Sequence, residues 1–415
     1  MDTSHEHAAG SGGEVAAREC AVSIVRRLQE AGYVAYLAGG CVRDRLLGFE
    51  STDYDVATSA RPEQIRACFK RAWGVGQSFG VMLVRLGEHT TEVATFRSDG
   101  PYIDQRHPSK VTFSDAREDA LRRDFTINGL FEDPVTDEII DYVDGRSDIE
   151  SRTLRAIGNP EDRFGEDHLR LLRAVRFSAR FGFDMDQSTM DAVRSHATEL
   201  SGVSRERIGH EIRFMMGSVT RARAIDLLEQ LGLDEKTLKE PPCHRAGRRL
   251  DSLEAETCIP TCMAAWLLDR CDADDLESQI DRVHRWRDSL VLSNEETLAM
   301  ERSLTWRKCL LSEFLQLPVA RQKRAVVSPG FAEAMSLLAL ESAGDADLVR
   351  YRISELETTG LSPDPLLTGD DLLREGVQAG PEMGRLLDRI YDAQLDSSIS
   401  TREEAVGLLR SLLGS

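Results

Sequence analysis

The sequence predicts a small α/β domain in about the first 150 residues, followed by an all-helical remainder. The first observation is that five short apolar runs bounded by turn residues, which are typical of β-strands, all lie in this N-terminal part. The second is that farther along the chain apolar residues recur at a spacing of three or four, which indicates amphipathic helices. Together these patterns predict a compact β-sheet domain and then a long helical arm.

Three helices are expected in the α/β domain. The first covers residues 18–31, where apolar positions recur at helical spacing and Gly32 supplies a common C-terminal signal. A second begins at Pro62, because proline is favoured in the first turn of a helix, and is expected to extend to residue 72. A third is predicted over residues 117–129.

The strands come from the apolar runs between these helices. They are expected at Tyr33–Ala38, Asp53–Ala57, Val81–Leu86, Glu92–Phe96 and Ile139–Val143. Only a few residues separate the third and fourth runs, which predicts a β-hairpin. Residues 98–116 are polar and rich in turn residues, and such a long loop in a compact domain usually has a function.

The remainder of the chain is predicted to be helical almost throughout. The expected helices are residues 161–182, 187–199, 205–217, 220–231, 260–270, 276–290, 295–315, 331–342, 346–358, 368–376, 381–394 and 401–413. The least ordered part of this arm is expected near residues 235–258. No fixed-period repeat is evident in the sequence.

The composition is typical of a soluble globular protein. Of its 415 residues, 41% are hydrophobic and 30% are charged. No apolar run reaches the roughly 20 residues of a membrane span. Residues 1–18 lack the apolar segment of a signal peptide and are expected to form a loose tail. The eight cysteines are scattered without metal-binding spacing, which predicts reduced thiols and a cytoplasmic location.

The net charge of −19 argues against a protein that coats nucleic acid with a basic surface. Binding driven by counterion release needs lysine and arginine at the contact surface. Five arginines do gather between Arg163 and Arg180. Any nucleic-acid partner is therefore expected to meet a local basic stripe.

Residues 37–57 combine two features of nucleotide chemistry. Gly39 and Gly40 end an apolar run and precede a helix-like turn, so backbone N–H groups there can approach a phosphate closely. Asp53 and Asp55 are two residues apart on a predicted strand, so their carboxylates would point the same way. Mg2+ prefers such oxygen ligands and often shares them with substrate phosphates. An isolated Asp-x-Asp is more often a solvated turn, but the combination favours a nucleotide site.

Two further segments supply candidate groups. Glu92 lies on a predicted strand and is a candidate third carboxylate, since two metal ions held by three carboxylates can promote phosphoryl transfer. The alternative interpretation is that Glu92 is an ordinary exposed glutamate at the rim of a sheet. The segment Arg122–Asn128 places two arginines, an acid and an amide on one predicted helix, with Phe125 and Ile127 as apolar anchors. Arginine suits triphosphate oxygens because its planar fork donates two hydrogen bonds.

A row of charged residues lies on the predicted helix at residues 161–182. Asp167, Arg170 and Arg173 are spaced by three and are expected to share one face. Arg176 continues the row. A carboxylate beside a guanidinium matches the amino donor and ring acceptor of cytosine and adenine, whereas uracil and guanine present the reverse polarity. The row could thus select CTP and ATP without a template; the alternative is a stripe of intrahelical salt bridges.

In order and spacing, these motifs resemble those of the class II tRNA nucleotidyltransferase/poly(A) polymerase family. The resemblance covers residues 30–215. It is carried by Gly39-Gly40-Cys41-Val42-Arg43-Asp44, Asp53-x-Asp55, Glu92-Val-Ala-Thr-Phe-Arg97, Arg122-Arg-Asp-Phe-Thr-Ile-Asn128 and Glu166-Asp-x-x-Arg170. Ser204-Arg-Glu-Arg-Ile208 is similar to a further motif in the neck domain of the family.

The resemblance implies an α/β nucleotidyltransferase head with a small mixed sheet, followed by an all-α neck, body and tail in an elongated, seahorse-like shape. The catalytic head would be residues 19–150, the base-recognising neck 151–220, and the tRNA-binding body and tail 221–415. The implied reaction is template-independent addition of C, C and A to the tRNA 3′ end from CTP and ATP, with release of pyrophosphate. The implied partners are the tRNA acceptor stem and the two nucleotides, with no membrane and no obligate protein partner.

The resemblance also implies roles for individual residues. Asp53 and Asp55 would bind Mg2+, and Glu92 would complete the catalytic carboxylates. Arg43 and Arg123 would hold the triphosphate together with Gly40. The full set of implied nucleotide-binding residues is Gly39, Gly40, Arg43, Arg123, Asp124, Asn128, Asp167, Arg170, Arg173 and Arg176. Of these, Asp167 and Arg170 would read the base.

Several functions remain open from the sequence. Within the family, the chain could be an A-adding enzyme, a CC-adding enzyme or a poly(A) polymerase. Residues 98–116 resemble the flexible element used in moving from CTP to ATP, and their presence argues against a CC-adding enzyme. Transfer of a nucleotide to a small molecule or protein would not need a long helical arm. A non-catalytic RNA-binding protein would not need the three carboxylates.

Overall fold

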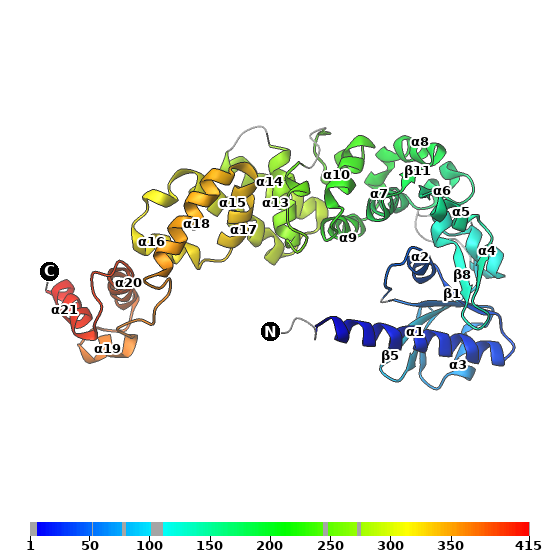
Figure 1. The fold of residues 1–415 in the computed structure, drawn as a ribbon, viewed down its shortest axis with the longest axis horizontal. Coiled ribbons are helices and arrows are strands. Elements are labelled where there is room, and N and C mark those ends of the chain that lie inside the picture. Colours follow the sequence, from blue (N-terminus) through cyan, green and yellow to red (C-terminus); the bar gives the residue numbers. More distant parts are fainter. Residues whose placement is uncertain are drawn as a thin grey trace. The chain divides into compact units, whose positions relative to one another are not determined.

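The computed structural model describes residues 6–51, 53–76, 80–100, 111–243, 248–271 and 275–414. The chain divides into two compact units. The N-terminal unit comprises Met1–Met215 and Arg223–His244, and the C-terminal unit comprises Met216–Ala222 and Arg245–Ser415. Figure 1 shows a sheet with helices in the N-terminal unit and a succession of helices in the C-terminal unit.

A seven-stranded mixed sheet forms the centre of the N-terminal unit, with strand order β3-β4-β5-β2-β1-β8-β9. Its strands are β1 (Ala35–Ala38), β2 (Asp55–Thr58), β3 (Ala72–Gly76), β4 (Val81–Leu86), β5 (His89–Thr95), β8 (Leu130–Asp133) and β9 (Glu138–Asp141). β2 and β5 are parallel, and all other neighbouring strands are antiparallel. β4 and β5 form the predicted hairpin, in which Leu86 lies opposite His89.

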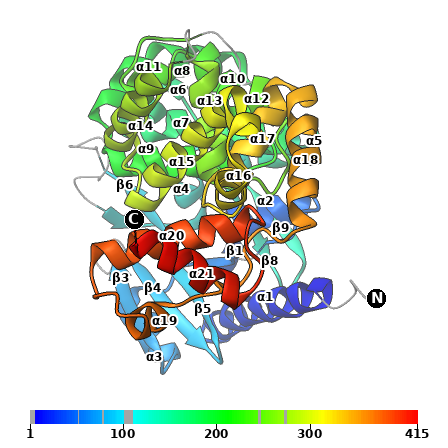
Figure 2. The same ribbon diagram turned by 90° about the vertical axis from the view of Figure 1, so that its left-hand side faces the viewer.

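Helix α1 (Glu6–Glu30) packs against β1, β2 and β5, and Figures 1 and 2 both show it beside these strands. Cys20, Ile24 and Leu28 follow one another at intervals of four residues and are all buried. Positions at this spacing lie on one face of a helix, so this face of α1 packs against the sheet. The helix ends before Gly32, as the sequence predicts. Two short helices, α2 (Gly40–Leu46) and α3 (Pro62–Cys68), follow β1 and β2.

The rest of the N-terminal unit is mainly helical. Its α-helices are α4 (Ala116–Leu121), α5 (Gly145–Glu150), α6 (Pro160–Glu166), α7 (Leu169–Phe181), α8 (Gln187–Ser195), α9 (Arg205–Met216), α10 (Arg221–Gln230) and α11 (Asp234–Leu238), the last residue of α9 and the first two of α10 belonging to the C-terminal unit. The 3-10 turns are η2 (Thr126–Asn128) and η3 (Ala197–Gly202). Two small sheets pair β6 (Arg97–Asp99) with β7 (Val111–Phe113), and β10 (Thr153–Leu154) with β11 (Asp184–Met185).

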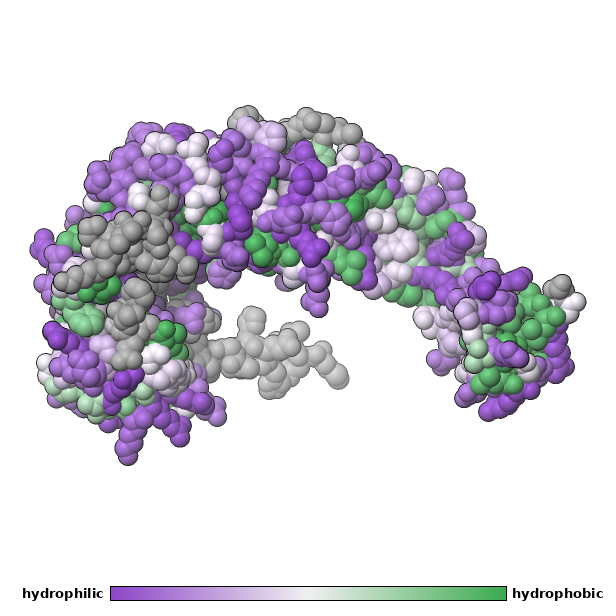
Figure 3. All heavy atoms as spheres, turned by 180° about the vertical axis from the view of Figure 1, so that it is seen from behind, coloured by the Kyte–Doolittle hydropathy of each residue, from purple (hydrophilic) through white to green (hydrophobic). Residues whose placement is uncertain are grey.

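The C-terminal unit is helical wherever the structure describes regular elements. They are α12 (Arg248–Asp251), α13 (Ile259–Asp269), α14 (Leu276–Leu290), α15 (Asn294–Ser312), η4 (Phe314–Gln316), α16 (Val319–Val326), α17 (Phe331–Glu341), α18 (Ala343–Glu357), α19 (Gly369–Arg374), α20 (Pro381–Leu395) and α21 (Arg402–Leu413). Buried Trp266 and Trp286 join α13 to α14, with ring centroids 4.7 Å apart. On the face drawn in Figure 3, hydrophilic residues predominate and hydrophobic ones form separate patches.

Two general predictions are tested here. All eight cysteines are free thiols, in agreement with the prediction of reduced cysteines. Among the helices that the structure describes, none is long and apolar enough to cross a membrane.

Several predicted boundaries are wrong. Residues 6–18, expected in a loose tail, belong to α1; residues 1–5 lie outside the described part. The strand predicted from Asp53 begins at Asp55 instead. The sequence pattern does not predict β3 or β8. Glycines interrupt the apolar run of β3, and β8 directly follows residues 117–129, which were predicted to be helical. The predicted loop at 98–116 includes most of β6 and all of β7, which pair with each other, and residues 101–110 lie outside the described part.

Two predicted helices are interrupted. The helix expected over residues 117–129 ends at Leu121, and a 3-10 turn follows at residues 126–128. The helix expected over residues 161–182 breaks between α6 and α7, so Asp167 lies at a junction and does not share a helical face with Arg170. Near the expected weakly ordered region 235–258, the regular elements among the described residues are the short helices α11 and α12.

Candidate active site

A pocket of about 570 Å³ in the N-terminal unit brings together most of the predicted site residues. The predicted residues that line it are Gly39, Gly40, Arg43, Asp55, Glu92, Arg123, Asp124, Asn128, Asp167, Arg170, Arg173 and Arg176. Asp53 is the exception: it is exposed just before β2 and does not line the pocket. The pocket therefore joins groups that are more than 130 residues apart in sequence, from the sheet and from α7.

The glycine pair forms the turn between β1 and α2. Gly39 has φ +71° and ψ −118°, a backbone conformation that residues with a side chain rarely adopt. Its N–H donates to the Leu130 carbonyl of β8 at 2.9 Å. A Cβ at this position would lie 2.6 Å from Nη1 of Arg123. The absence of a side chain at Gly39 therefore lets Arg123 lie against the backbone of the turn.

Two carboxylates face the pocket from neighbouring strands. Asp55 begins β2, and the parallel register of Val56 with Val93 places Glu92 of β5 beside it. Limited solvation and the nearby charge of Glu92 raise the pKa of Asp55 to about 6, although Arg123 acts in the opposite direction. Asp53 adds to this repulsion from the end of the preceding loop. Oxygen donors with uncompensated negative charge fit a hard divalent cation such as Mg2+.

Arg43 is held at the pocket by polar and aromatic neighbours. It is buried, its Nε donates to Asp44 at 2.8 Å, and its Nη1 donates to Oδ1 of Asn128 at 2.5 Å. Its guanidinium lies over the ring of Phe181, 4.6 Å from the centroid, and 5.1 Å from that of Phe177. Because these contacts leave the group little freedom, Arg43 is preorganised to meet an anion in the pocket.

Arg123 is fixed in a similar way by the segment after α4. Its Nη2 donates to Asp119 at 3.1 Å, and its Nη1 donates to the carbonyl of Asn128, also at 3.1 Å. The guanidinium lies 5.0 Å from the ring centroid of Phe131. Arg123 also lies near enough to Asp55 to influence the pKa of that carboxylate. It therefore links the arginines of the pocket to its acidic part.

Asp124 is a buried anchor between this segment and α7. Its carboxylate accepts from Nε of Arg173 at 2.7 Å and from the side chain of Asn128 at 3.0 Å, and Nη2 of Arg173 lies 2.6 Å away as part of the same ion pair. Burial alone would raise the pKa of Asp124, but the charge of Arg173 and these hydrogen bonds hold the pKa well below its usual range. The main role of Asp124 is therefore to position Arg173 and Asn128, and direct contact with a ligand is secondary.

Asp167 and Arg170 reach the pocket from the junction of α6 and α7. Asp167 accepts from Arg207 of α9 at 2.6 Å and from the backbone N–H of Leu169 at 3.0 Å. Arg170 donates to Glu166 at 2.5 Å. Each oxygen of a carboxylate has two lone pairs, so Asp167 keeps acceptor capacity toward the pocket.

The structure adds residues that were not predicted for the site. Arg207 lines the pocket and lies in the segment Ser204–Ile208. The similarity of this segment to a neck motif of the family is the sequence feature that points to Arg207. Phe177 lines the pocket, and the guanidinium of Arg176 lies 4.4 Å from its ring centroid. Arg122 and Arg180 also line it. In all, eight arginines and four carboxylates line the pocket, so it is locally cationic within an acidic protein.

Two family models match this chain. One is described as the poly A polymerase head domain and matches residues 35–155; the other is described as "Probable RNA and SrmB- binding site of polymerase A" and matches residues 182–241. The first model covers the sheet and both carboxylates, whereas the second begins just after α7.

Known proteins resemble the chain over nearly its whole length. The CCA-adding enzyme of Lactobacillus delbrueckii subsp. bulgaricus is 30% identical over 396 residues, which cover 93% of this chain and 96% of that enzyme. The CCA-adding enzyme of Streptococcus gordonii is 31% identical over 402 residues, covering 93% and 95%. The crystal structure of the Bacillus stearothermophilus CCA-adding enzyme in complex with CTP matches with a TM-score of 0.75 and 28% identity, covering 95% and 97%.

The similarity includes both the α/β part and the helical part, and the pocket contains the residue types that the chemistry of nucleotide transfer requires. This chain is therefore a nucleotidyltransferase that belongs to the CCA-adding enzymes of the class II tRNA nucleotidyltransferase/poly(A) polymerase family.

Proposed function

We propose that this protein adds C, C and A in turn to the 3′ end of tRNA, using CTP and ATP without a template and releasing pyrophosphate. The observation that carries the proposal is the pocket, which Asp55 and Glu92 line together with eight arginines. The relatives support it, since two are named CCA-adding enzymes and the matching crystal structure contains CTP.

Mg2+ is the proposed cofactor, held by Asp53 and Asp55 with Glu92 nearby. Burial and, after it, the charge of Glu92 raise the pKa of Asp55, and a divalent cation would offset the charge of this pair. When bound, the cation would lower the pKa of the attacking hydroxyl and offset charge on the phosphates. Because Asp53 does not line the pocket, Asp55 and Glu92 supply the direct structural support for this assignment.

Arg43 and Arg123 are the proposed triphosphate ligands. Both line the pocket and both are held by neighbouring acids or amides, so binding would cost them little side-chain entropy. A guanidinium also donates two parallel hydrogen bonds to a phosphate group. In the reaction the 3′-hydroxyl oxygen of the RNA bonds to the α-phosphorus while the bond to pyrophosphate breaks. Fixed arginines would stabilise the charge that develops on the departing pyrophosphate.

Asp167 and Arg170 are the proposed base-reading pair. Asp167 would accept from the amino group of cytosine or adenine, and Arg170 would donate to the adjacent ring acceptor. Arg207 donates to Asp167 at 2.6 Å, which orients the carboxylate for this contact. Uracil and guanine present a carbonyl and a ring N–H at the same positions and would leave both protein groups unpaired.

The experiment that tests this function uses one tRNA prepared with three different 3′ ends: the discriminator base, C and CC. Each RNA is incubated with Mg2+ and with CTP, ATP or both, and the products are separated at single-nucleotide resolution. Stepwise completion to CCA on all three RNAs is the expected result.

The other outcomes identify the alternatives. Extension of only the CC-ended RNA by a single A would show an A-adding enzyme, and arrest after two cytidines would show a CC-adding enzyme. A long ladder of A on any RNA would show a poly(A) polymerase. No transfer to any of these RNAs would contradict the assignment of a tRNA substrate. A cytoplasmic location is proposed with this function, in keeping with the free thiols of the protein.

A further inference from the structure

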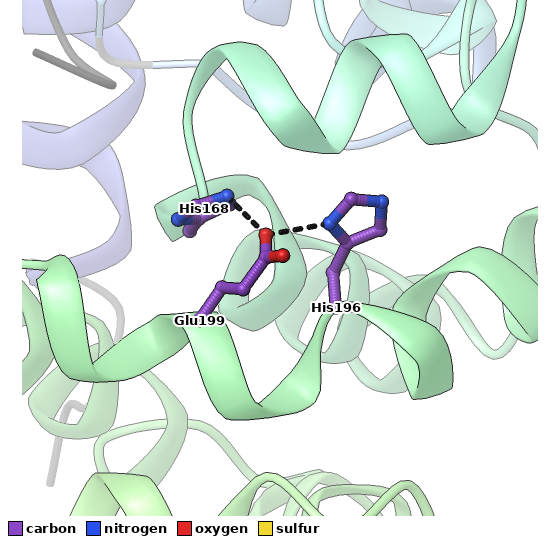
Figure 4. Close-up of side chains that lie close together, drawn as sticks. All are labelled: His168, His196 and Glu199. Atoms are coloured by element: carbon purple, nitrogen blue, oxygen red, sulfur yellow. Dashed lines mark hydrogen bonds and ion pairs between the residues drawn. The ribbon is translucent and has the colours of Figure 1, made fainter.

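Two histidines and a glutamate converge in the N-terminal unit away from the lining of the pocket (Figure 4). His168 lies at the junction of α6 and α7, directly after Asp167. His196 directly follows α8, and Glu199 lies in the adjoining turn η3. The three side chains therefore come from separate elements of one compact unit, and neither the nucleotide nor the RNA requires them in the function proposed above.

Their ligand atoms point at one place. Nε2 of His168 lies 2.6 Å from Oε2 of Glu199, and Nδ1 of His196 lies 2.7 Å from the same oxygen. Figure 4 shows both rings directed at this carboxylate. One ligand atom from each residue lies within 4.8 Å of the other two. Two imidazoles and a carboxylate converging in this way form a donor set that transition metals use in proteins.

We propose that His168, His196 and Glu199 form a binding site for a divalent transition-metal cation of the zinc class, coordinated through Nε2, Nδ1 and a carboxylate oxygen. Two imidazole nitrogens favour Zn2+ and similar cations over Mg2+, which prefers oxygen ligands. Metal–ligand bonds of about 2.0–2.2 Å require the three atoms to separate slightly. Glu199 can make this adjustment because 46% of its side chain is exposed.

The surroundings of His196 match those of a metal-bound histidine. Its second ring nitrogen, Nε2, lies 2.8 Å from the carboxylate of Glu161. Histidine ligands of metals commonly donate their other N–H to a carboxylate, which fixes the ring and makes it a stronger ligand. Glu161 also accepts from the hydroxyl of Ser195 at 3.2 Å, so this carboxylate is itself oriented. With a cation bound at Nδ1, the remaining ring proton would lie on Nε2 and be donated to Glu161.

His168 is the buried side of the site. Its side chain is only 3% exposed, so the ring is held inside the fold. Its Nδ1 is buried and has no hydrogen-bond partner among the residues that the structure describes. Without a cation, the ring therefore carries its proton on Nε2 and donates it to Glu199. Coordination through Nε2 would transfer that proton to Nδ1, a change of tautomer that can be observed.

A cation at this place would tie the α6–α7 junction to the end of α8 and to η3. Because Asp167 is the residue before His168, the same tie would hold the carboxylate proposed to read the base. The site would thus be a structural clamp on the base-reading segment, chemically distinct from the carboxylates of the pocket.

The test uses the full-length protein in excess Mg2+, so that the pocket carboxylates are occupied by the cation they prefer. Co2+ is the spectroscopic probe and Zn2+ the competitor. The expected result is visible absorption from one bound Co2+ per chain, displaced by one equivalent of Zn2+, together with a 15N signal of the Nδ1–H tautomer of His168. Zn2+ is also expected to raise the thermal midpoint of the N-terminal unit, whereas additional Mg2+ would not.

Variants separate coordination from general effects. Glu199→Gln alters an exposed side chain and is expected to fold while losing at least about 100-fold in affinity. Glu161→Gln is expected to lose about 10–100-fold, because it removes the partner of His196 rather than a ligand. His210→Gln is the matched control: this exposed histidine of α9 contacts the ring of Phe214 and lies outside the cluster. Absence of stoichiometric Co2+ binding, or equal binding by Glu199→Gln and the wild type, would overturn the proposal.

Discussion

Arg173 of α7 forms an ion pair with Asp124: its Nε donates to Oδ2 at 2.7 Å, and its Nη2 lies 2.6 Å from the same oxygen. The two residues are 49 positions apart, and Asp124 is almost fully buried. A buried carboxylate needs such partners because an unpaired charge there would be strongly destabilising. This ion pair therefore ties the segment after α4 to α7, which supplies four of the eight arginines of the pocket.

Asp124→Asn should destabilise the protein by about 1.5–3 kcal/mol at pH 7, the usual worth of hydrogen bonds to a charged group. The pKa of Asp124 is lowered in the folded state, so its contribution is fully present above the unfolded pKa of about 3.9 and is lost as the pH falls below it. The difference between wild type and variant should accordingly shrink in acid. Urea unfolding at several pH values measures this difference.

The control for that prediction is Asp184→Asn, whose side chain is 99% exposed and whose nearest cation is 3.5 Å away. An exposed pair of this kind contributes little, so the stability curve should be unchanged. A loss of stability in Asp124→Asn that stays constant down to pH 2 would contradict the role given to its charge.

Asp55→Asn should abolish most nucleotide transfer without harming the fold. Removal of a group that stabilises transition-state charge commonly lowers kcat by about 100–1,000-fold. Burial and, after it, the charge of Glu92 raise the pKa of Asp55, so removal of its charge should leave the thermal midpoint unchanged or higher. Single-turnover transfer and thermal unfolding are measured together. Glu138→Gln, an exposed substitution on β9, is the control and should retain full activity; an active Asp55→Asn would refute the catalytic assignment.

Gly39→Ala should weaken nucleotide binding and destabilise the fold, whereas Gly40→Ala should retain stability. At Gly39 the positive φ disfavours any residue with a side chain by about 1–3 kcal/mol. The new Cβ would also lie 2.6 Å from Nη1 of Arg123, so the guanidinium of Arg123 would have to move. At Gly40 the nearest atom is Nη2 of Arg43 at 3.6 Å, an ordinary contact. The KM for CTP and the thermal midpoint measure the two effects. Equal stability of both variants would show that the turn tolerates a side chain.

Asp167→Ala should relax base choice more than it slows the reaction with CTP. Loss of one hydrogen bond to a charged group corresponds to about 10–100-fold in discrimination against UTP and GTP. The measurement compares kcat/KM for the four nucleotides. Asp162→Asn, an exposed acid of α6 bound to Asn159, is the control and should keep the wild-type preference. If Asp167→Ala keeps that preference while losing activity, Asp167 acts only by holding Arg207.

Elements governed by local pattern were well predicted. The helix expected at residues 276–290 is α14 with the same ends, and the strand expected at Val81–Leu86 is β4. Apolar spacing of 3.6 or 2 residues reports which face of an element is buried, and that information is contained in a short window of sequence. All the residues predicted for the site except Asp53 line one pocket, and they were proposed from their residue types and from the resemblance.

The interrupted helices show where local information ends. Asp124 accepts from the N–H of Phe125 at 2.8 Å, and Asp167 accepts from the N–H of Leu169 at 3.0 Å. Each carboxylate thus competes for a backbone group that would otherwise extend a helix. These acids take positions that also suit a distant arginine, Arg173 or Arg207, and that requirement is invisible in a local window.

The sequence by itself determined the order of the elements, the apolar faces that pack and the set of groups available for chemistry. The tertiary structure decided which of those groups meet. It placed Glu92 beside Asp55 through a parallel strand register, left Asp53 outside the pocket, and set His168 against Glu199. The physical reason is that burial and pairing of charge depend on residues far apart in the chain, whose positions are defined only when the core has packed.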